Sequence, residues 1–224
     1  FIAWLVFLKF KNPGIVDFFW SLVIFETASN YFLFSSKNLT DLGLWCFFLL
    51  FLWAFRLSMS LLFSRILKAH KENRYYELSQ AWHRPLSFSC LLQFLFQGVL
   101  AFLISLPFSV LFLFKSQIGF VEIVCLSFMA IGFLCEWQCD YILKEFKKTA
   151  GPLDVCKRGL WKYSRHPNYF FEWLQWIAYV FLSVGSDEFY LSLIGPIFMY
   201  FFLIKISGVY WVELQAVKKR GEVY

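Results

Sequence analysis

The segment GLWKYSRHPNYFFEW, residues 159–173, gathers polar side chains between long apolar runs. Lys162, Arg165 and His166 precede Pro167, and proline is favoured in the first turn of a helix, where its missing N–H costs nothing. Cations beside the free backbone N–H groups of a helix start make a place for an anion, most simply a phosphate. We therefore predict that a helix begins here and that a phosphate binds beside its start.

The helix predicted after Pro167 carries one polar face. At about 100° per residue, this face contains Asn168, Glu172, Gln175 and Tyr179. The excess of cations that is usual in cytoplasmic loops would explain Lys157 or Lys162 taken alone. This excess of cations does not explain why an amide and a carboxylate follow on one face of an apolar helix. Ionisable groups at membrane depth are costly and usually belong to a functional site.

A second polar stripe ends the apolar run before this segment, in CEWQCDYILKEFKK. On a helix, its four charged side chains fall within an arc of about 80°, and they are Glu136, Asp140, Lys144 and Lys147. A solvated helix end with i,i+4 ion pairs is the alternative, and it suffices for Lys144 and Lys147 alone. The two carboxylates follow the apolar FMAIGFLC, so we predict a stripe that faces a site.

Further charged residues lie inside the other apolar runs. Arg56 stands in the middle of one run, and Asp17 stands near the start of the run before it. A structural Asp17–Arg56 ion pair and a catalytic role for these residues are both open interpretations. Lys205, in the last run, either extends its long side chain to the membrane surface or belongs to the site.

The elements that position these residues are predicted to be transmembrane helices. Hydrophobic residues make up 60% of the 224 residues and charged residues only 16%, far from the roughly 25% charged residues of soluble domains. Because a spanning helix needs about 20 mostly apolar residues, we predict an all-α bundle in a single domain over 1–224. About seven spans are expected, near 1–10, 15–34, 42–64, 86–114, 117–143, 169–185 and 189–212, with a kink at Pro107.

Loop charges predict the orientation of this bundle. If the loops alternate between the two sides, seventeen Lys and Arg residues fall on one side and two, Lys37 and Lys115, on the other. The positive side should be cytoplasmic, with the N-terminus outside, the C-terminus inside and residues 159–173 facing the cytoplasm. The expected location is a bacterial inner membrane, or the endoplasmic reticulum in a eukaryote. The net charge of +6 thus reflects membrane topology. The uneven distribution of the loop charges excludes a soluble nucleic-acid-binding protein.

Common cofactor motifs are absent from the sequence. The six cysteines form no CxxC and no zinc-type spacing, so no metal site is predicted. The glycines form no GxGxxG and no Walker loop, and there is no GxSxG or HExxH. A nucleotide, if one binds, must therefore be held by the membrane-embedded fold itself.

These motifs together resemble a family, the bacterial membrane proteins grouped as domain of unknown function 1295, within the steroid 5-alpha-reductase-like superfamily. The segment GLWKYSRHPNYFFEW looks like the family's signature, and NPGIVDFFWSL is similar to its early Asp-x-x-Trp motif. LWAFRLSMSLLFSRILKAHKENRYYELSQAW resembles its Trp-x-x-Arg-Leu helix and the charged loop with Glu72, Arg74 and Tyr75. KISGVYWVELQAVKKRGEVY, with Glu213, resembles its tail.

The resemblance implies an NADPH site. In the steroid reductases, the helix end that DYILKEFK resembles contacts NADPH, and so do the Asn and Glu that correspond to Asn168 and Glu172, beside the nicotinamide. The phosphates lie at the basic cytoplasmic loop. Together with the two stripes, this predicts a cofactor site of Glu136, Asp140, Lys144, Lys147, Arg158, Lys162, Tyr163, Arg165, His166, Asn168, Tyr169 and Glu172.

The chain departs from the steroid reductases at the groups that polarise the substrate carbonyl. Trp53 stands where those enzymes have a Tyr, and an indole cannot give up a proton to a carbonyl. No Glu occupies the other position, since Asp17 and Glu26 are only nearby, and Ser64 replaces an Asn. The substrate and the proton donor are therefore left open, with Asp17, Arg56 and Glu172 as the catalytic candidates.

The sequence thus predicts a membrane NADPH-dependent reductase of an activated C=C bond in a steroid- or lipid-like substrate that enters from the bilayer. One alternative is an S-adenosylmethionine-dependent methyltransferase of isoprenylcysteine or lipid, since such enzymes share the Arg-His-Pro motif. Asn168 and Glu172 favour the reductase. The other alternative is a non-catalytic lipid-binding protein. The sequence gives no oligomeric state.

Overall fold

Every regular element in the described part of the chain is a helix. The computed structural model describes residues 2–35, 40–66, 80, 82–113, 118–151, 153–206 and 208–221. In chain order the elements are α1 (Ile2–Phe10), α2 (Ile15–Phe34), α3 (Asp41–Leu61), the π-helix η2 (Leu62–Ile66), α5 (Leu86–Leu113), α6 (Phe120–Thr149), the 3₁₀-helix η3 (Gly159–Lys162), α7 (Pro167–Leu182), α8 (Phe189–Ser192), α9 (Ile194–Phe201), the π-helix η4 (Phe202–Ile206) and α10 (Val209–Arg220). The predicted all-α class is confirmed for these residues. The expected charged loop with Glu72, Arg74 and Tyr75 lies outside them.

Four helical stretches are long and apolar enough to cross a membrane: α3, α5, α6 and the stretch Phe189–Lys218. The shorter α1 and α7 have 9 and 16 residues, against the roughly 20 that a span needs. The 20 residues of α2 include Asp17 and Glu26, which lower its mean hydropathy. The chain is thus a membrane protein by the character of these helices, while the count of seven spans and the orientation of the termini stay predictions.

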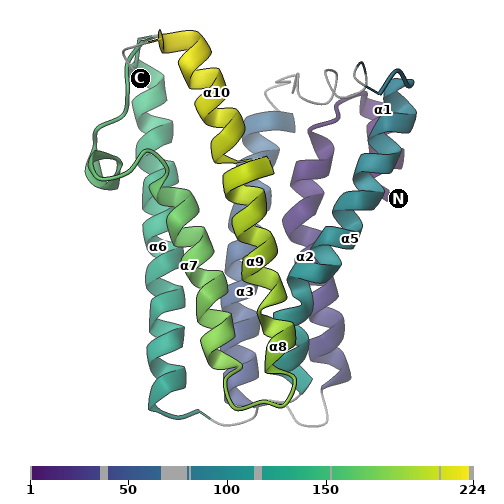
Figure 1. Ribbon diagram of the computed structural model, residues 1–224, viewed down its shortest axis with the longest axis vertical. Helices are drawn as coiled ribbons and strands as arrows, with labels where there is room; N and C mark the ends of the chain where they lie inside the picture. The colour runs from purple at the N-terminus through teal and green to yellow at the C-terminus, as the bar shows by residue number, and fades with distance from the viewer. Residues whose placement is uncertain are drawn as a thin grey trace.

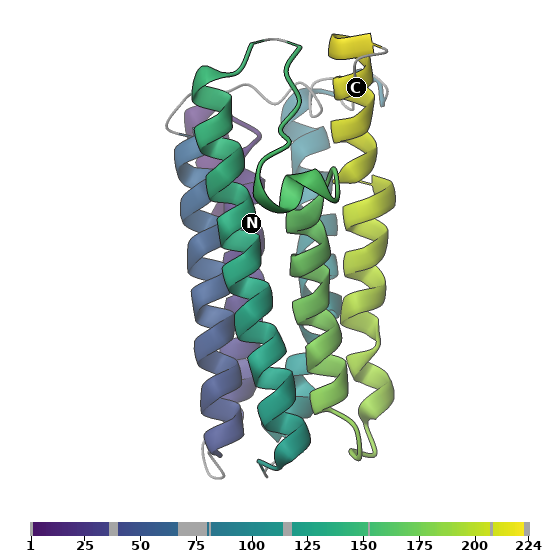
Figure 2. The ribbon, with the colours of Figure 1, turned by 90° about the vertical axis from the view of Figure 1, so that its left-hand side faces the viewer.

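The long helices lie side by side in one bundle (Figures 1 and 2). Helix α6 packs mainly on α7, and α2 packs on α3 and α5. Between them lies a continuous apolar core, to which Leu50, Ile104, Phe108 and Trp176 contribute fully buried side chains. A second, smaller cluster of Phe7, Val16, Cys90 and Phe94 joins α1 to α2 and α5.

The outer surface of the bundle is also apolar. Large exposed side chains follow the outward faces of the helices, among them Trp45, Phe48 and Phe55 on α3 and Phe128, Ile131 and Trp137 on α6. A soluble monomer rarely exposes contiguous apolar patches of this extent. Lipid is the solvent that these faces require.

The last expected span, 189–212, is broken and extends further than predicted. It consists of α8, α9 and η4, followed after a break by α10, which runs to Arg220. At Gly208 the backbone N–H donates to the carbonyl oxygen of Phe202 at 3.3 Å. A Cβ at this position would lie 2.3 Å from the carbonyl oxygen of Leu203, so the turn admits only glycine.

Helix α5 remains one helix through Pro107, and α9 packs closely against this proline at Gly195. A Cβ on Gly195 would lie 2.6 Å from Pro107 Cγ and 3.0 Å from the carbonyl oxygen of Ile104. The absence of a side chain on Gly195 therefore sets the α5–α9 spacing, as small residues do at membrane helix interfaces.

Replacing Gly195 by valine is expected to destabilise the protein, because the added side chain would push α9 away from Pro107. Overpacking of this kind costs typically about 1–3 kcal/mol, which should lower the midpoint of thermal unfolding in detergent by several degrees. Gly98→Ala on α5 is the matched control, since nothing lies within 4 Å of its added Cβ. A Gly195→Val protein as stable as wild type would contradict the close packing described here.

Candidate functional site

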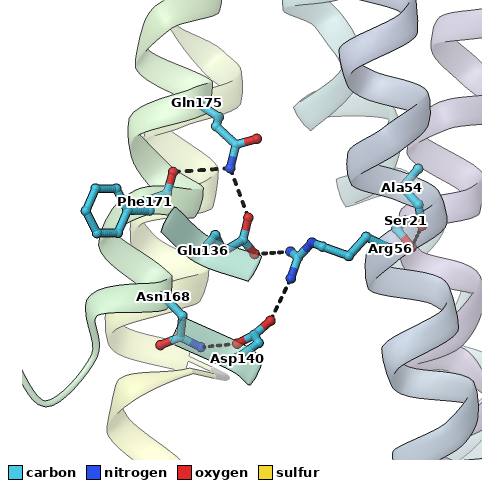
Figure 3. Close-up of polar contacts among 8 residues, drawn as sticks. All are labelled: Ser21, Ala54, Arg56, Glu136, Asp140, Asn168, Phe171 and Gln175. Carbon is cyan, nitrogen blue, oxygen red and sulfur yellow. Dashed lines mark hydrogen bonds and ion pairs between the residues drawn. The ribbon is translucent and has the colours of Figure 1, made fainter. Parts of the chain in front are cut away.

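Arg56 on α3 is held by two carboxylates from α6. Its side chain is only 10% exposed, and its guanidinium donates through Nη1 to Asp140 Oδ2 at 2.6 Å and through Nη2 to Glu136 Oε1 (Figure 3). Glu136 and Asp140 are four residues apart, so they lie on one face of α6 one above the other. The two carboxylates therefore pair with the guanidinium from successive turns of α6.

Helix α7 completes the arrangement with two side-chain amides. Asn168 Nδ2 donates to Asp140 Oδ1 at 3.2 Å, and Gln175 Nε2 donates to Glu136 Oε2 at 2.9 Å (Figure 3). Gln175 Nε2 also donates to the carbonyl oxygen of Phe171 at 3.2 Å. Glu136 and Asp140 are thus each bridged between the guanidinium of α3 and an amide of α7.

Gly132 allows α7 to come close enough for these contacts. A Cβ at Gly132 would lie 2.9 Å from Gln175 Cγ and 3.3 Å from the carbonyl oxygen of Phe171. The sequence predicts Gln175 on the polar face of α7 but does not identify it as a site residue, and it predicts no role for Gly132. A signal was present, because Gly132 lies four residues before Glu136 on the same face of α6.

Glu172 lies on the same face of α7, between Asn168 and Gln175, and is 8% exposed. Its carboxyl group interacts electrostatically with Glu136, Arg56 and Asp140, but accepts no hydrogen bond from any residue that the structure describes. We call Arg56, Glu136, Asp140, Asn168, Glu172 and Gln175 the buried polar cluster. It contains three carboxyl groups and one guanidinium.

Several polar atoms in and beside this cluster are buried without a hydrogen-bond partner in the described part of the chain. They are Asn168 Oδ1, Arg56 Nε and Trp53 Nε1. The indole of Trp53, one turn before Arg56, packs edge-on against Trp176 at 5.7 Å between ring centroids. An unsatisfied buried polar group costs about 1–3 kcal/mol. The unpaired acceptor and the two unpaired donors are therefore groups that a ligand can satisfy.

The basic residues predicted for the phosphates lie at the end of α6 and in the segment before α7, which folds back beside α6 (Figure 2). The nitrogen Nε1 of Trp161 anchors this segment by donating to the carbonyl oxygen of Cys139 at 3.0 Å. The exposed members of the predicted set are Lys144, Lys147, Arg158, Lys162, Tyr163 and Arg165. We call Lys144, Lys147, Arg158 and Lys162 the basic end.

Two of the predicted residues are engaged by α10. Glu213 accepts from Arg165 Nη1 at 2.8 Å and contacts His166 Nε2 at 2.5 Å. The ring of His166 also stacks on Tyr169, with 5.7 Å between centroids. Helix α10 thereby holds the segment that precedes α7 in place through Glu213. This role of Glu213 could not be predicted from the sequence.

Other predicted residues lie elsewhere. The guanidinium of Arg56 pairs with α6, so the Asp17–Arg56 pair considered from the sequence is not the contact that forms. At this level α2 contacts α3 through Ser21 Oγ, which lies 2.7 Å from Ser58 Oγ. Tyr179 continues the polar face of α7 but packs edge-on against Phe108 in the apolar core. Lys205 lies on η4 and is exposed.

The fold and the site together define an all-helical membrane protein with an ionic cluster enclosed between α3, α6 and α7. The sequence model of the family described as protein of unknown function (DUF1295) matches residues 3–224. The chain therefore belongs to this family, as its motifs predicted. No curated protein and no solved structure gives a match.

Removing the guanidinium by Arg56→Met is expected to cost about 3–5 kcal/mol of stability, because it leaves the buried carboxyl group of Glu136 without its cation. Chemical unfolding in mild detergent, followed by tryptophan fluorescence, measures this loss. Combining Arg56→Met with Glu136→Gln and Asp140→Asn should restore more than half of it.

The matched control is Lys148→Met, which breaks the Lys148–Glu145 pair. The side chains of this pair are 59% and 38% exposed, and exposed pairs contribute little. If Arg56→Met and Lys148→Met were equally harmless, the buried polar cluster would not be the support of the α3–α6 contact.

Proposed function

We propose that the protein is a membrane NADPH-dependent reductase of an activated C=C bond in a hydrophobic substrate. The observation that carries this proposal is the pair formed by Asn168 Oδ1, a buried acceptor without a partner, and the carboxyl of Glu172, one turn further along α7. A nicotinamide carboxamide presents two N–H donors, so the residues present fit it. The resemblance to the steroid reductases assigns the same two residues to the nicotinamide.

The position of this pair relative to the basic end supports a dinucleotide. Asp140 and Lys144 are consecutive on one face of α6, and four residues of helix rise about 6 Å. A ligand that reaches from the buried polar cluster to the basic end would therefore place an amide at one end and phosphates at the other. Lys147, Arg158 and Lys162 would hold the phosphates, including the 2′-phosphate that distinguishes NADPH from NADH.

NADPH, when bound, would supply a hydride to one carbon of the C=C bond, and a proton would follow at the other carbon to complete the reduction. The chain's own contribution would be electrostatic. Trp53 Nε1–H and Arg56 Nε–H are buried donors one turn apart on α3, and both are without partners in the described residues. Donors of this kind stabilise the negative charge that develops on a carbonyl oxygen conjugated to the reacting bond. Glu136 and Asp140 would keep Arg56 in place, while Asp17 stays a prediction.

The apolar outer faces of α3 and α6 support a substrate that enters from the bilayer. The cofactor would enter from the cytoplasm, because the basic end carries the loop charges that are expected on that side. The protein would accordingly be a multi-pass protein of a bacterial inner membrane or of the endoplasmic reticulum.

Thermal unfolding of the detergent-purified protein with NADPH, NADH and S-adenosylmethionine tests this proposal. At 100 times its Kd, a ligand stabilises the folded state by about 2.7 kcal/mol, so NADPH should raise the midpoint by several degrees. Asn168→Ala and Glu172→Ala should abolish this rise, while Lys162→Gln should reduce the preference for NADPH over NADH.

Asp187→Asn is the matched control, since Asp187 is exposed and lies between α7 and α8, at the opposite end of the bundle from the basic end (Figure 1). Its response to NADPH should equal that of wild type. Stabilisation by S-adenosylmethionine instead of NADPH would indicate that the protein is a methyltransferase. No response to any of the three would favour a non-catalytic lipid-binding protein.

A further inference from the structure

The buried polar cluster contains more acidic groups than basic ones. Arg56 is the single cation, and it faces Glu136 and Asp140, while Glu172 adds a third carboxyl group. Asn168 and Gln175 satisfy hydrogen bonds of the first two carboxylates but bring no charge. The cluster therefore has an excess of acidic groups in a region from which most water is excluded.

Glu172 is the member without a partner. Its side chain is more than nine-tenths buried, yet it makes no hydrogen bond or ion pair within the described residues. A buried carboxyl group without a partner can ionise at low cost only when a cation lies beside it, so this position favours a positively charged ligand group. In the part of the chain that the structure describes, no three His, Cys, Asp or Glu side chains are grouped to hold a metal ion. An organic cation fits the cluster better.

We infer that the buried polar cluster selects the oxidised, cationic form of the nicotinamide cofactor, so that the protein binds NADP⁺ more tightly than NADPH. This inference rests on the proposed function. The two forms carry identical phosphates, and the basic end therefore contributes equally to both affinities. They differ by the one positive charge of the oxidised ring, which is the charge that Glu172 and its acidic neighbours stabilise.

A preference for NADP⁺ would affect both the free energy of hydride transfer and the inhibition of the protein by its product. A site that favours positive charge on the ring lowers the free energy of the oxidised cofactor relative to the reduced one, which favours hydride donation to the substrate. It also makes NADP⁺ a strong inhibitor that competes with NADPH. The protein would thus respond to the ratio of the two forms in the cytoplasm rather than to the concentration of NADPH alone.

Titrations of the detergent-purified protein with NADP⁺ and NADPH, by calorimetry, test this inference. One unit charge at roughly 10 Å in an effective dielectric constant of about 20 corresponds to a change in affinity of about tenfold. We expect wild type to bind NADP⁺ about tenfold or more tightly than NADPH. Glu172→Gln, which cannot ionise but keeps an acceptor, should lower this preference about tenfold, whereas Glu172→Asp should retain it.

Two further variants separate this effect from general changes in affinity. Lys162→Gln should weaken both dinucleotides together and leave their ratio unchanged, because it acts on the phosphates. Asp187→Asn removes a carboxylate at the other end of the bundle and should change neither affinity. A ratio near one in wild type, or an unchanged ratio in Glu172→Gln, would overturn the inference alone. Failure of both dinucleotides to bind would overturn the proposed function as well.

Discussion

The rest of the structure depends on one buried guanidinium. Arg56 lies inside an apolar helix, where an unpaired charge would be prohibitively costly, and two carboxylates of α6 compensate it from successive turns. This compensation fixes the rotation of α6, because only one face of that helix carries both Glu136 and Asp140. In this orientation Glu136 and Asp140 each have a second carboxylate oxygen that does not contact Arg56. Each of these oxygens accepts a hydrogen bond from a side-chain amide of α7.

The short distance between α6 and α7 follows from the same constraint. An amide hydrogen bond reaches only about 3 Å, so the helix backbones must approach closely, and Gly132 permits this where a side chain would collide with Gln175. In lipid, helices associate through such close packing and through hydrogen bonds rather than through the hydrophobic effect. The polar contacts of the cluster therefore contribute to helix association as well as to any ligand site.

Charge changes sign along the C-terminal half of α6. Within the bundle it carries the buried Glu136 and the partly exposed Asp140, and its exposed end carries Lys144, Lys147 and Lys148. A ligand with phosphates at one end and a neutral or cationic ring at the other matches this order, whereas a fully anionic ligand does not. Glu213, by holding Arg165 and His166, keeps the segment that joins α6 to α7 beside this gradient.

Much of this arrangement could be predicted from local sequence. Apolar run length fixes helices within a few residues, because a helix in lipid must satisfy its own backbone, and Pro167 fixes the start of α7. The stripes of α6 and α7 follow from helical periodicity alone.

The sequence could not predict which carboxylate would pair with Arg56. Asp17, Glu136 and Asp140 all lie on apolar helices, and the pairing depends on which helices become neighbours. It also could not predict that Glu172 is left without a partner, that Gly132 and Gly195 are contact points, or that the last helix breaks at Gly208. These features depend on distances between segments far apart in the chain, and only the packed bundle sets those distances.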